Sequence, residues 1–225
     1  MRWIGLAFIG LGGVAVLLAL GFWQVRRLEW KSGILNEIET RVAAAPVDLP
    51  ADPDPDADQY LPVEIDGRTT GDELHVLVST AQTGAGYRLI APFETGTRRI
   101  MVDLGVIPTT EKEPMRPGQR LVVLGNLHWP QEIDRFTPEP ERDRNIWFAR
   151  EVEAMSDALG TEPLLVVARS MTPEVPGVTP LPVSTTNIPN DHLQYAITWF
   201  SIAALWAGMT VLLGWRMAGG IRRKA

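Results

Sequence analysis

The chain begins and ends with long apolar stretches that enclose a more polar interior. No charged residue occurs from Trp3 to Trp23 or from Tyr195 to Trp215. A helix needs about 20 apolar residues to cross the roughly 30 Å hydrocarbon core of a membrane, so each stretch predicts a transmembrane helix. Aromatic residues stand near the ends of both stretches, as they do in the aromatic belts of membrane proteins. We expect transmembrane helices over 3–24 and 192–216, with one domain over 25–191 between them.

The first apolar stretch has two other interpretations. It could be a signal peptide, since Arg2 is basic and small residues occur at Ala19 and Gly21. It is longer than the roughly 7–15 apolar residues of such a peptide, which favours an uncleaved anchor. Gly10 to Ala15 also fits the dinucleotide-binding pattern G-x-G-x-x-A. That pattern needs a preceding strand and a turn, whereas here the apolar run continues unbroken.

Small residues in both apolar stretches are expected to let the two helices pack closely. Gly10, Gly12 and Gly13, the glycines of that pattern, are interpreted as packing residues. Two small-xxx-small pairs support the same expectation: Ala15 with Ala19, and Ala204 with Gly208.

The interior has a mixed periodicity. Apolar residues from Leu28 to Val42 recur at helical spacing, which predicts that the first helix continues beyond the membrane. From Tyr60 onward, short apolar segments separated by Gly, Pro and Thr turns predict strands. The segments are 61–65, 74–78, 87–93, 99–107, 120–128 and 164–168. An amphipathic helix from Val152 to Leu159, stopped by Gly160, interrupts them.

These elements predict an α+β membrane protein. Two transmembrane helices flank an antiparallel β-rich domain outside the membrane, which is either a sheet or a small barrel with one short amphipathic helix. The segment Met171 to Pro189 carries several prolines and is expected to return extended toward the membrane.

Composition excludes several classes of function. The formal net charge is −6, and an acidic surface does not favour nucleic acid. The chain has no cysteine, which excludes disulfides, thiol nucleophiles and Cys-ligated metal centres. The acidic run Asp52 to Asp58 lacks the glycine and the glutamate that a calcium-binding EF-hand loop requires, so we interpret it as a solvated linker.

Basic residues near the two spans predict the orientation. Five of them lie between an apolar stretch and the nearer end of the chain, namely Arg2, Arg216, Arg222, Arg223 and Lys224. Three lie just after the first span, namely Arg26, Arg27 and Lys31. The positive-inside rule therefore favours cytoplasmic termini and a periplasmic domain. No Arg- and Ser-rich transit segment precedes the first span, so we expect a multi-pass protein of a bacterial inner membrane.

Catalytic motifs are absent from the sequence, and we do not expect an enzyme. There is no G-x-S-x-G, H-E-x-x-H or P-loop pattern, and no pair of carboxylates stands out as acid and base. The chain has three histidines. His75 and His128 lie within strand patterns and are expected to be satisfied within the sheet.

His192 differs because it lies at the start of the second membrane helix, where Asn190 or Asp191 can cap the free N–H groups. His192, Tyr195 and Trp199 share one helical face. Trp23, Arg27 and Trp30 share a face where the first span ends, next to Gln24.

If the spans pack together, these two groups of residues could meet. One interpretation is an ordinary aromatic belt with a snorkelling arginine. The other is a site for a flat, partly anionic ligand such as haem, with His192 on the iron and Arg27 on a propionate.

Two motifs resemble those of a known family. The segment from Gly21 to Lys31, GFWQVRRLEWK, is similar to the opening signature of the Surfeit-locus-one (Shy-type) family of cytochrome c oxidase assembly factors. The segment from Pro189 to Phe200, PNDHLQYAITWF, resembles its closing signature. Weaker resemblances lie between them in the same order, at 60–67, 86–92 and 102–108. The family usually has Arg-Gly-Trp in the last of these blocks, where this chain has Leu104, Gly105 and Val106. A role for that Arg and Trp in partner contact is therefore not carried over.

The resemblance implies a two-span inner-membrane protein that helps cytochrome c oxidase subunit I to mature. It implies transient binding of haem a, with His192 as the iron ligand, and it allows haem a synthase as a second partner. The isoprenoid tail of haem a would then stay in the lipid bilayer while the iron is held at the interface. Two alternatives remain: a chaperone that holds subunit I without binding haem, and a membrane-anchored enzyme that modifies haem.

Overall fold

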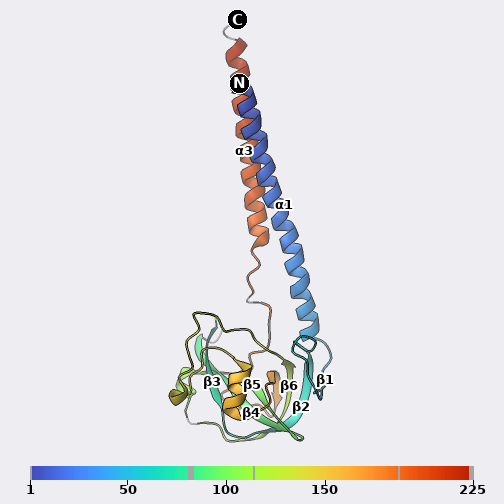
Figure 1. Ribbon diagram of the computed structural model, residues 1–225, viewed down its shortest axis with the longest axis vertical. Helices are drawn as coiled ribbons and strands as arrows, with labels where there is room; N and C mark the ends of the chain where they lie inside the picture. The colour runs from blue at the N-terminus through green and yellow to red at the C-terminus, as the bar shows by residue number, and fades with distance from the viewer. Residues whose placement is uncertain (1, 81–83, 114, 187, 223–225) are drawn as a thin grey trace. The chain divides into compact units, whose positions relative to one another are not determined.

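The computed structural model describes residues 2–80, 84–113, 115–186 and 188–222. The chain divides into two compact units (Figure 1). One consists of residues 1–37 and 185–225, and the other of residues 38–184. The boundaries differ from the predicted 25–191 domain, because the first helix continues well past the expected end of the span and forms part of both units.

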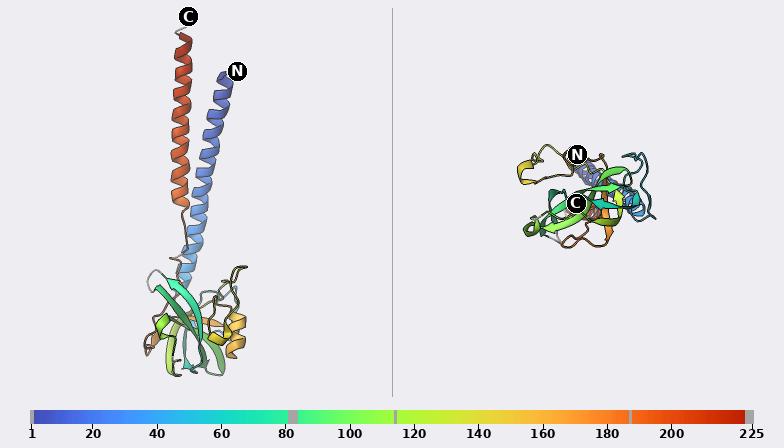
Figure 2. Two further views of the ribbon diagram at one scale, coloured as in Figure 1. Left: turned by 90° about the vertical axis from the view of Figure 1, so that its left-hand side faces the viewer. Right: turned by 90° about the horizontal axis from the view of Figure 1, so that it is seen from below.

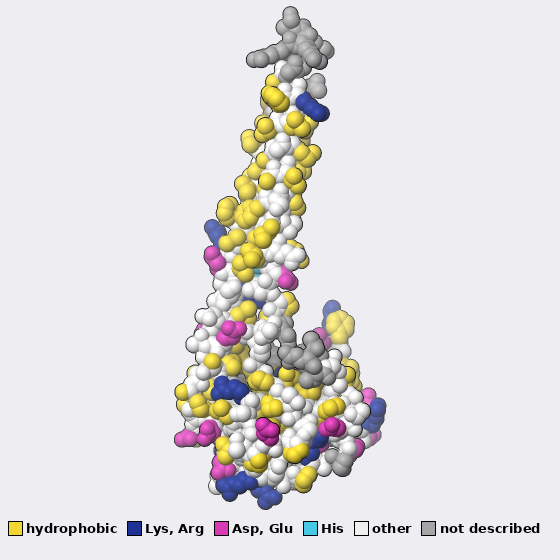
Figure 3. All heavy atoms as spheres, turned by 180° about the vertical axis from the view of Figure 1, so that it is seen from behind, with side chains coloured by type: hydrophobic (Ala, Val, Ile, Leu, Met, Phe, Trp, Pro, Cys, Tyr) yellow, Lys and Arg dark blue, Asp and Glu magenta, His cyan; other side chains and the backbone are white. Residues whose placement is uncertain are grey.

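The first unit is a pair of long helices, α1 (Arg2–Val42) and α3 (His192–Arg222). They lie side by side and antiparallel, since the start of α1 and the end of α3 lie at the same end of the pair (Figures 1 and 2). The segments Trp3–Val42 and His192–Ala218 are long and apolar enough to cross a membrane, judged by length and composition. Apolar side chains such as Phe8, Leu205 and Val211 are exposed along the pair (Figure 3). This surface suits a lipid environment.

Glycines of α1 allow the helices to approach each other. A methyl group added at Gly10, Gly13 or Gly21 would overlap Thr210, Trp206 or Phe200 of α3, respectively. Ala196 and Ala203 are the small buried residues on the facing side of α3. Small residues bring two backbones close together when the helices cannot rely on excluding water. The prediction of packing glycines is therefore confirmed for Gly10 and Gly13 and wrong for Gly12, which is exposed and where a methyl group would meet nothing within 4 Å; Gly21 is a further packing glycine.

The predicted small-xxx-small pairs were wrong. Ala15, Ala19, Ala204 and Gly208 are all exposed. Their spacing would allow packing, but the side of each helix that meets the other is set by different residues. On α1 that side carries Gly10, Gly13, Gly21 and Gln24, which recur at helical spacing.

The second unit is a seven-stranded mixed sheet in the order β1-β2-β6-β7-β5-β4-β3. An additional pairing of β2 with β4 closes strands β2, β6, β7, β5 and β4 into a ring, so the domain is a small barrel rather than an open sheet. The elements are β1 (Val47–Asp48), β2 (Pro62–Thr69), β3 (Leu74–Thr80), β4 (Gly84–Thr95), β5 (Arg98–Pro108), β6 (Arg120–Leu127), α2 (Val152–Leu159) and β7 (Leu165–Thr172), with 3-10 turns η1 (Thr109–Glu111) and η2 (Arg142–Arg144).

Each predicted strand and the predicted helix occurs, but the sheet is not wholly antiparallel. Among the described residues, β1 pairs with β2 in parallel, and β5 pairs with β7 in parallel. The parallel pairing of β5 and β7 requires a long crossover, which consists of β6, the loop after it and α2. Gly160 ends α2 in a left-handed conformation, as predicted.

The central strands are apolar at successive positions because both of their faces are covered. Leu89 and Phe93 of β4 point into the barrel core, whereas Ile90 packs in a second cluster with Trp147 and Met155. Strand β7 is divided in the same way. A strand covered on both faces shows a continuous apolar run instead of alternation.

Buried charges organise one side of the barrel. Asp103 is fully buried, and its Oδ2 accepts a bond from Arg88 Nε at 2.6 Å. Arg150 also donates to Asp103, and its guanidinium pairs with Glu132. Arg88 Nη2 donates to the carbonyl of Leu181 at 2.8 Å, which holds the returning segment against the barrel. The buried charges of Arg88, Arg150 and Asp103 are thus paired, and Glu132 supplies the second negative charge from an exposed position.

The end of α1 is anchored within this second unit. The carbonyl of Val42 accepts bonds from Asn126 Nδ2 at 3.1 Å and from Arg169 Nη1 at 3.0 Å. Carbonyls at a helix C-terminus lack partners within the helix, so these side chains satisfy one of them. The predicted extension of the first helix beyond the membrane is therefore tied to the barrel.

Candidate functional site

The candidate site lies where α3 begins. His192 is the first residue of α3 and is half-buried. Its Nδ1 lies 2.7 Å from Oε1 of Gln24 on α1. Gln24 is only 8% exposed. A buried polar side chain normally requires a hydrogen-bond partner, and His192 provides one. His192 Nε2 has no hydrogen-bond partner among the residues that the structure describes, so this nitrogen is available to a ligand.

Two further contacts hold the approach to α3 against α1. Lys31 Nζ donates to the carbonyl of Pro189, and Asn190 Nδ2 donates to Ser32 Oγ at 3.3 Å. Together with Gln24, these residues extend over about two turns of α1. The sequence did not indicate these contacts, because nothing local to Lys31 or Ser32 marks a partner so distant in the chain.

Asn190, one of the two predicted caps of α3, does not cap the helix with its side chain. Asn190 uses its amide nitrogen for Ser32, and its Oδ1 is buried without a partner among the described residues. Asp191 directly precedes α3, and its carbonyl accepts the first bond of the helix from the Tyr195 N–H at 3.1 Å. Contacts with α1 determine the position of Asn190.

The other predicted site residues are half-buried or exposed. Trp199 is half-buried, and Tyr195 is 56% exposed at the edge of the face that carries His192. On α1, Trp23 is 56% exposed and Arg27 is also exposed. The guanidinium of Arg27 lies 3.9 Å from the centre of the Trp30 ring, a cation–π contact within its own helix. The structure therefore joins Gln24 to His192, whereas Trp23, Arg27 and Trp30 are exposed on α1.

A hollow at the start of α3 lies away from His192. It has a volume of about 350 Å³ and is lined by Asn190, Asp191, Leu193, Gln194, Ile197 and Thr198. On a helix of 3.6 residues per turn, these positions are on the side opposite His192. The hollow therefore does not contribute to the site around the imidazole.

The donor set fits haem better than a free metal ion. Among the described residues, no group of three or more His, Asp or Glu side chains could hold a metal ion. Haem brings four nitrogen ligands of its own and needs only an axial donor from the protein. A single imidazole with an unpartnered nitrogen, next to exposed apolar side chains, meets this requirement.

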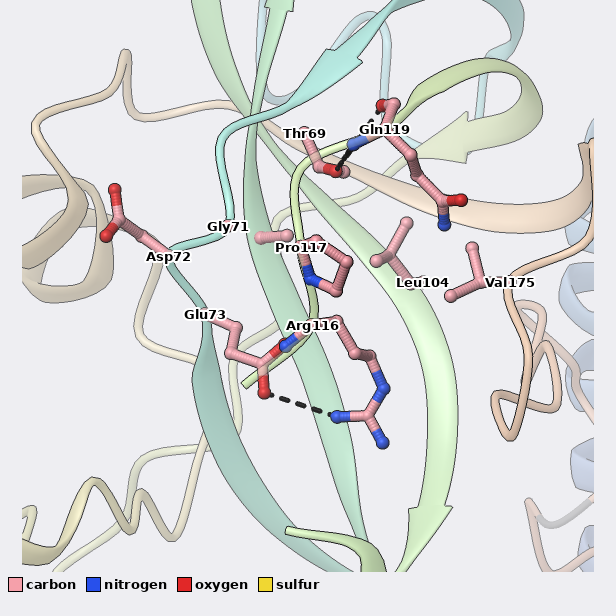
Figure 4. Close-up of a pocket in the computed structure, with 10 residues that line it drawn as sticks. Thr69, Gly71, Asp72, Glu73, Leu104, Arg116, Pro117, Gln119 and Val175 are labelled. Carbon is pink, nitrogen blue, oxygen red and sulfur yellow. Dashed lines mark hydrogen bonds and ion pairs between the residues drawn. The ribbon is translucent and has the colours of Figure 1, made fainter. Parts of the chain in front are cut away.

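Two other hollows, both in the barrel unit, are structural. The first, shown in Figure 4, has a volume of about 10 Å³, which leaves no room for an organic ligand. Next to it, the buried carboxylate of Glu73 accepts bonds from Arg116 at 3.2 Å and from His75 at 3.0 Å. Asn145 donates to the other nitrogen of His75 at 3.1 Å. His75 is thus satisfied within the fold, as predicted.

The second hollow, of about 410 Å³, is bordered by Tyr60, His128 and Trp129. The amide of Gln59 bonds to His128 Nδ1 and to both backbone groups of Trp129. The His128 ring stacks on Tyr60 with a centroid distance of 5.3 Å. Burial lowers the pKa of His128 to about 4, with help from the positive charge of Arg150. These polar groups are occupied in holding the loop, and His128 is neutral at ordinary pH.

Comparison with known proteins identifies the family. A family model described as the SURF1 family matches residues 11–204, which include most of α1, the whole barrel and the first part of α3. The chain belongs to the SURF1 family. Members of the SURF1 family are known as cytochrome c oxidase assembly factors.

Individual SURF1 relatives extend this result. Human Surfeit locus protein 1 is 32% identical over 212 residues, which cover 82% of this chain and 69% of the human protein. The rat protein of the same name is 30% identical, with 84% and 69% covered. A SURF1-like protein of Drosophila melanogaster is 29% identical, with 84% and 71% covered.

In β5, the two residues that depart from the SURF1 pattern are buried, which indicates a packing role for them. Leu104 and Val106, which replace the usual Arg and Trp, are 3% and 4% exposed. The retained Gly105 has a φ of +128°, and a side chain there would overlap the carbonyl of Thr179. In this chain the block packs the barrel and holds the returning segment, so Leu104 and Val106 offer no surface to a partner.

Proposed function

We propose that this SURF1 family member binds haem a transiently through His192 and assists its insertion into subunit I of cytochrome c oxidase. One observation carries the proposal. His192 presents an unpartnered Nε2 at the start of a membrane-length helix, and its other nitrogen is held by a buried residue of the neighbouring helix. Imidazole is a common axial ligand of haem iron.

The surroundings support a ligand that is part apolar and part polar. Tyr195 and Trp199 lie on the same side of α3 and can flank a macrocycle. The isoprenoid tail of haem a suits the apolar helix surface beyond them. Arg27 is exposed near the level of Gln24 but contacts Trp30, so a propionate partner is not assigned to it.

Single-site ligation suits a carrier. A protein that must pass haem a to subunit I releases it more easily from an open site than from a closed pocket. His192 is half-buried on an open surface rather than in a cavity. The expected arrangement in the cell is a bacterial inner membrane with both termini cytoplasmic and the barrel periplasmic, supported by the distribution of arginines and lysines. Haem a synthase is then a reasonable donor of the haem, and subunit I its acceptor.

The visible spectrum of the purified protein tests this proposal. The chain is produced in cells that make haem a and is purified in mild detergent. We expect a bound pigment in the wild type and its loss in His192→Ala. His75→Ala is the matched control and should keep the pigment, because both nitrogens of His75 are hydrogen-bonded inside the barrel unit.

Three outcomes separate the alternatives. An unpigmented wild type whose His192→Ala variant still supports full oxidase assembly would overturn the proposal and favour a chaperone that acts without haem. Conversion of haem into a new product would favour an enzyme. Pigment that survives in His192→Ala would show that another residue is the ligand.

A further inference from the structure

We infer that Gln24 is a positioning residue that keeps the proton of His192 on Nδ1 and leaves Nε2 bare for a ligand. The atoms that face each other are Gln24 Oε1 and His192 Nδ1, at 2.7 Å. An amide oxygen can only accept a hydrogen bond, so Nδ1 must donate. In a neutral imidazole the second nitrogen then carries a lone pair. Gln24 thereby selects the tautomer in which Nε2, rather than Nδ1, can ligate iron.

The packing around Gln24 makes this contact strong. Gly21 lies one turn before it, and a methyl group at Gly21 would come within 2.5 Å of the Phe200 ring. Ala196 lies one turn after His192 and is 2% exposed. These small residues bring the backbones close enough for the Gln24 side chain to reach the imidazole. Because Gln24 is buried, its side chain has little water to replace this hydrogen bond if it is lost.

Further contacts restrain the backbone that leads into α3. Lys31 donates to the carbonyl of Pro189, and Asn190 donates to Ser32, three and two residues before His192. The start of α3 is therefore held against α1 by these contacts as well as by Gln24. In haem and metal sites, a group that accepts the proton of the non-ligating nitrogen fixes the ring and makes the other nitrogen more basic. Gln24 is placed to do this for His192.

The tautomer can be measured without any ligand. The whole haem-free chain, labelled with ¹⁵N-histidine, is studied in detergent micelles by long-range ¹H–¹⁵N NMR at a pH where the imidazoles are neutral. The chain has three histidines, and the signals of His192 are the ones lost in His192→Ala. We expect a protonated Nδ1 and a bare Nε2 in the wild type. The reverse pattern would overturn the inference, whatever the protein binds.

Three substitutions at glutamines sharpen this experiment. Gln24→Leu removes the acceptor at similar size, so His192 should move toward the Nε2–H form. Gln24→Glu keeps an acceptor oxygen and should retain the wild-type tautomer. Gln194→Leu is the matched control, because Gln194 is exposed on the opposite side of α3. An unchanged tautomer in Gln24→Leu would also overturn the inference.

A second readout rests on the proposed function. If His192 ligates haem, Gln24→Leu should weaken haem binding by roughly 10–100-fold, the usual cost of losing such a supporting group. Gln24→Glu should retain haem and lower its reduction potential, because a carboxylate draws the Nδ1 proton more strongly and makes Nε2 a stronger donor to iron.

The two failures can be told apart. An unpigmented wild type defeats the proposed function and leaves the tautomer result standing. A wild type that binds haem through His192, with neither affinity nor potential changed in Gln24→Leu and Gln24→Glu, defeats the positioning role alone.

Discussion

At the scale of single residues, the three histidines occupy three different environments. His75 has a partner on each nitrogen, from Glu73 and Asn145. His128 accepts a bond from Gln59 and stacks on Tyr60. His192 has one partner and one bare nitrogen. Because Nδ1 of His128 accepts its bond from Gln59, Nε2 of the neutral ring carries the proton, whereas the Nδ1 of His192 faces an acceptor; this difference singles out His192 as the histidine suited to ligation.

The depressed pKa of His128 predicts a loss of stability in mild acid. The pKa is about 4 in the folded protein and about 6.5 in the unfolded chain. Above pH 6.5 the ring is neutral in both states and contributes no pH dependence. As the pH falls from 6.5 toward 4, the unfolded chain takes up a proton that the folded protein does not, so the free energy of unfolding decreases. At pH 5 this decrease is about 2 kcal/mol.

Unfolding by denaturant at pH 7 and pH 5 measures this effect. His128→Gln removes the titrating group, so the variant should lose about 2 kcal/mol less than the wild type between the two pH values. Comparison within this pair cancels the titration of the carboxylates. An NMR titration midpoint of His128 near 6.5 would contradict the prediction.

At the scale of elements, the helix pair is held by glycines on one side of α1. Gly21 is buried against Phe200, whereas a side chain at Gly12 would meet nothing within 4 Å. Both residues are glycines of the same apolar helix, so they have similar intrinsic helix propensity. The contrast between them isolates packing against α3.

Gly21→Leu should therefore separate α1 from α3, and Gly12→Leu should not. The chain has no cysteine, so an engineered pair at Ser32 and Asn190, whose side chains are 3.3 Å apart, reports on the contact through disulfide formation. We expect cross-linking in membranes to fall several-fold in Gly21→Leu and to stay at the parent level in Gly12→Leu. Equal cross-linking in both variants would show that the glycine contact is dispensable.

At the scale of the whole molecule, two membrane-length helices enclose the barrel unit in the sequence. If both helices span, the two ends of the chain lie on one side of the membrane and the barrel on the other. The excess of basic residues at the ends of the chain favours the cytoplasm for the termini. This arrangement would place His192 at the outer surface of the membrane.

Single cysteines test this orientation in intact cells. Asp157→Cys lies on the exposed side of α2, and Ala218→Cys lies near the end of α3; each is the sole thiol of its variant. A membrane-impermeant maleimide added to bacterial spheroplasts should label Asp157→Cys, and it should label Ala218→Cys only after lysis. The opposite pattern would invert the orientation and move the site to the cytoplasmic surface.

Local patterns in the sequence determined much of the fold and part of the site. The apolar stretches, the strand segments and the stop at Gly160 could be read locally, because burial and backbone conformation impose periodicity on neighbouring residues. His192 could be singled out because it begins the apolar helix, and the two end motifs indicated the family. The contact between Gln24 and His192, and the exposure of the nearby Arg27, could not be read, since Gln24 and Arg27 are both close to the end of the same span.

Tertiary structure decided what depends on residues distant in the chain. Closure of the barrel rests on two residue pairs between β2 and β4. The helix pair uses Gly10, Gly13 and Gly21 rather than the equally plausible alanines. Gln24 and His192 are 168 positions apart, and only their contact determines which nitrogen of the imidazole is bare. Sequence periodicity defines the faces of an element, but the partner that each face meets is settled by packing.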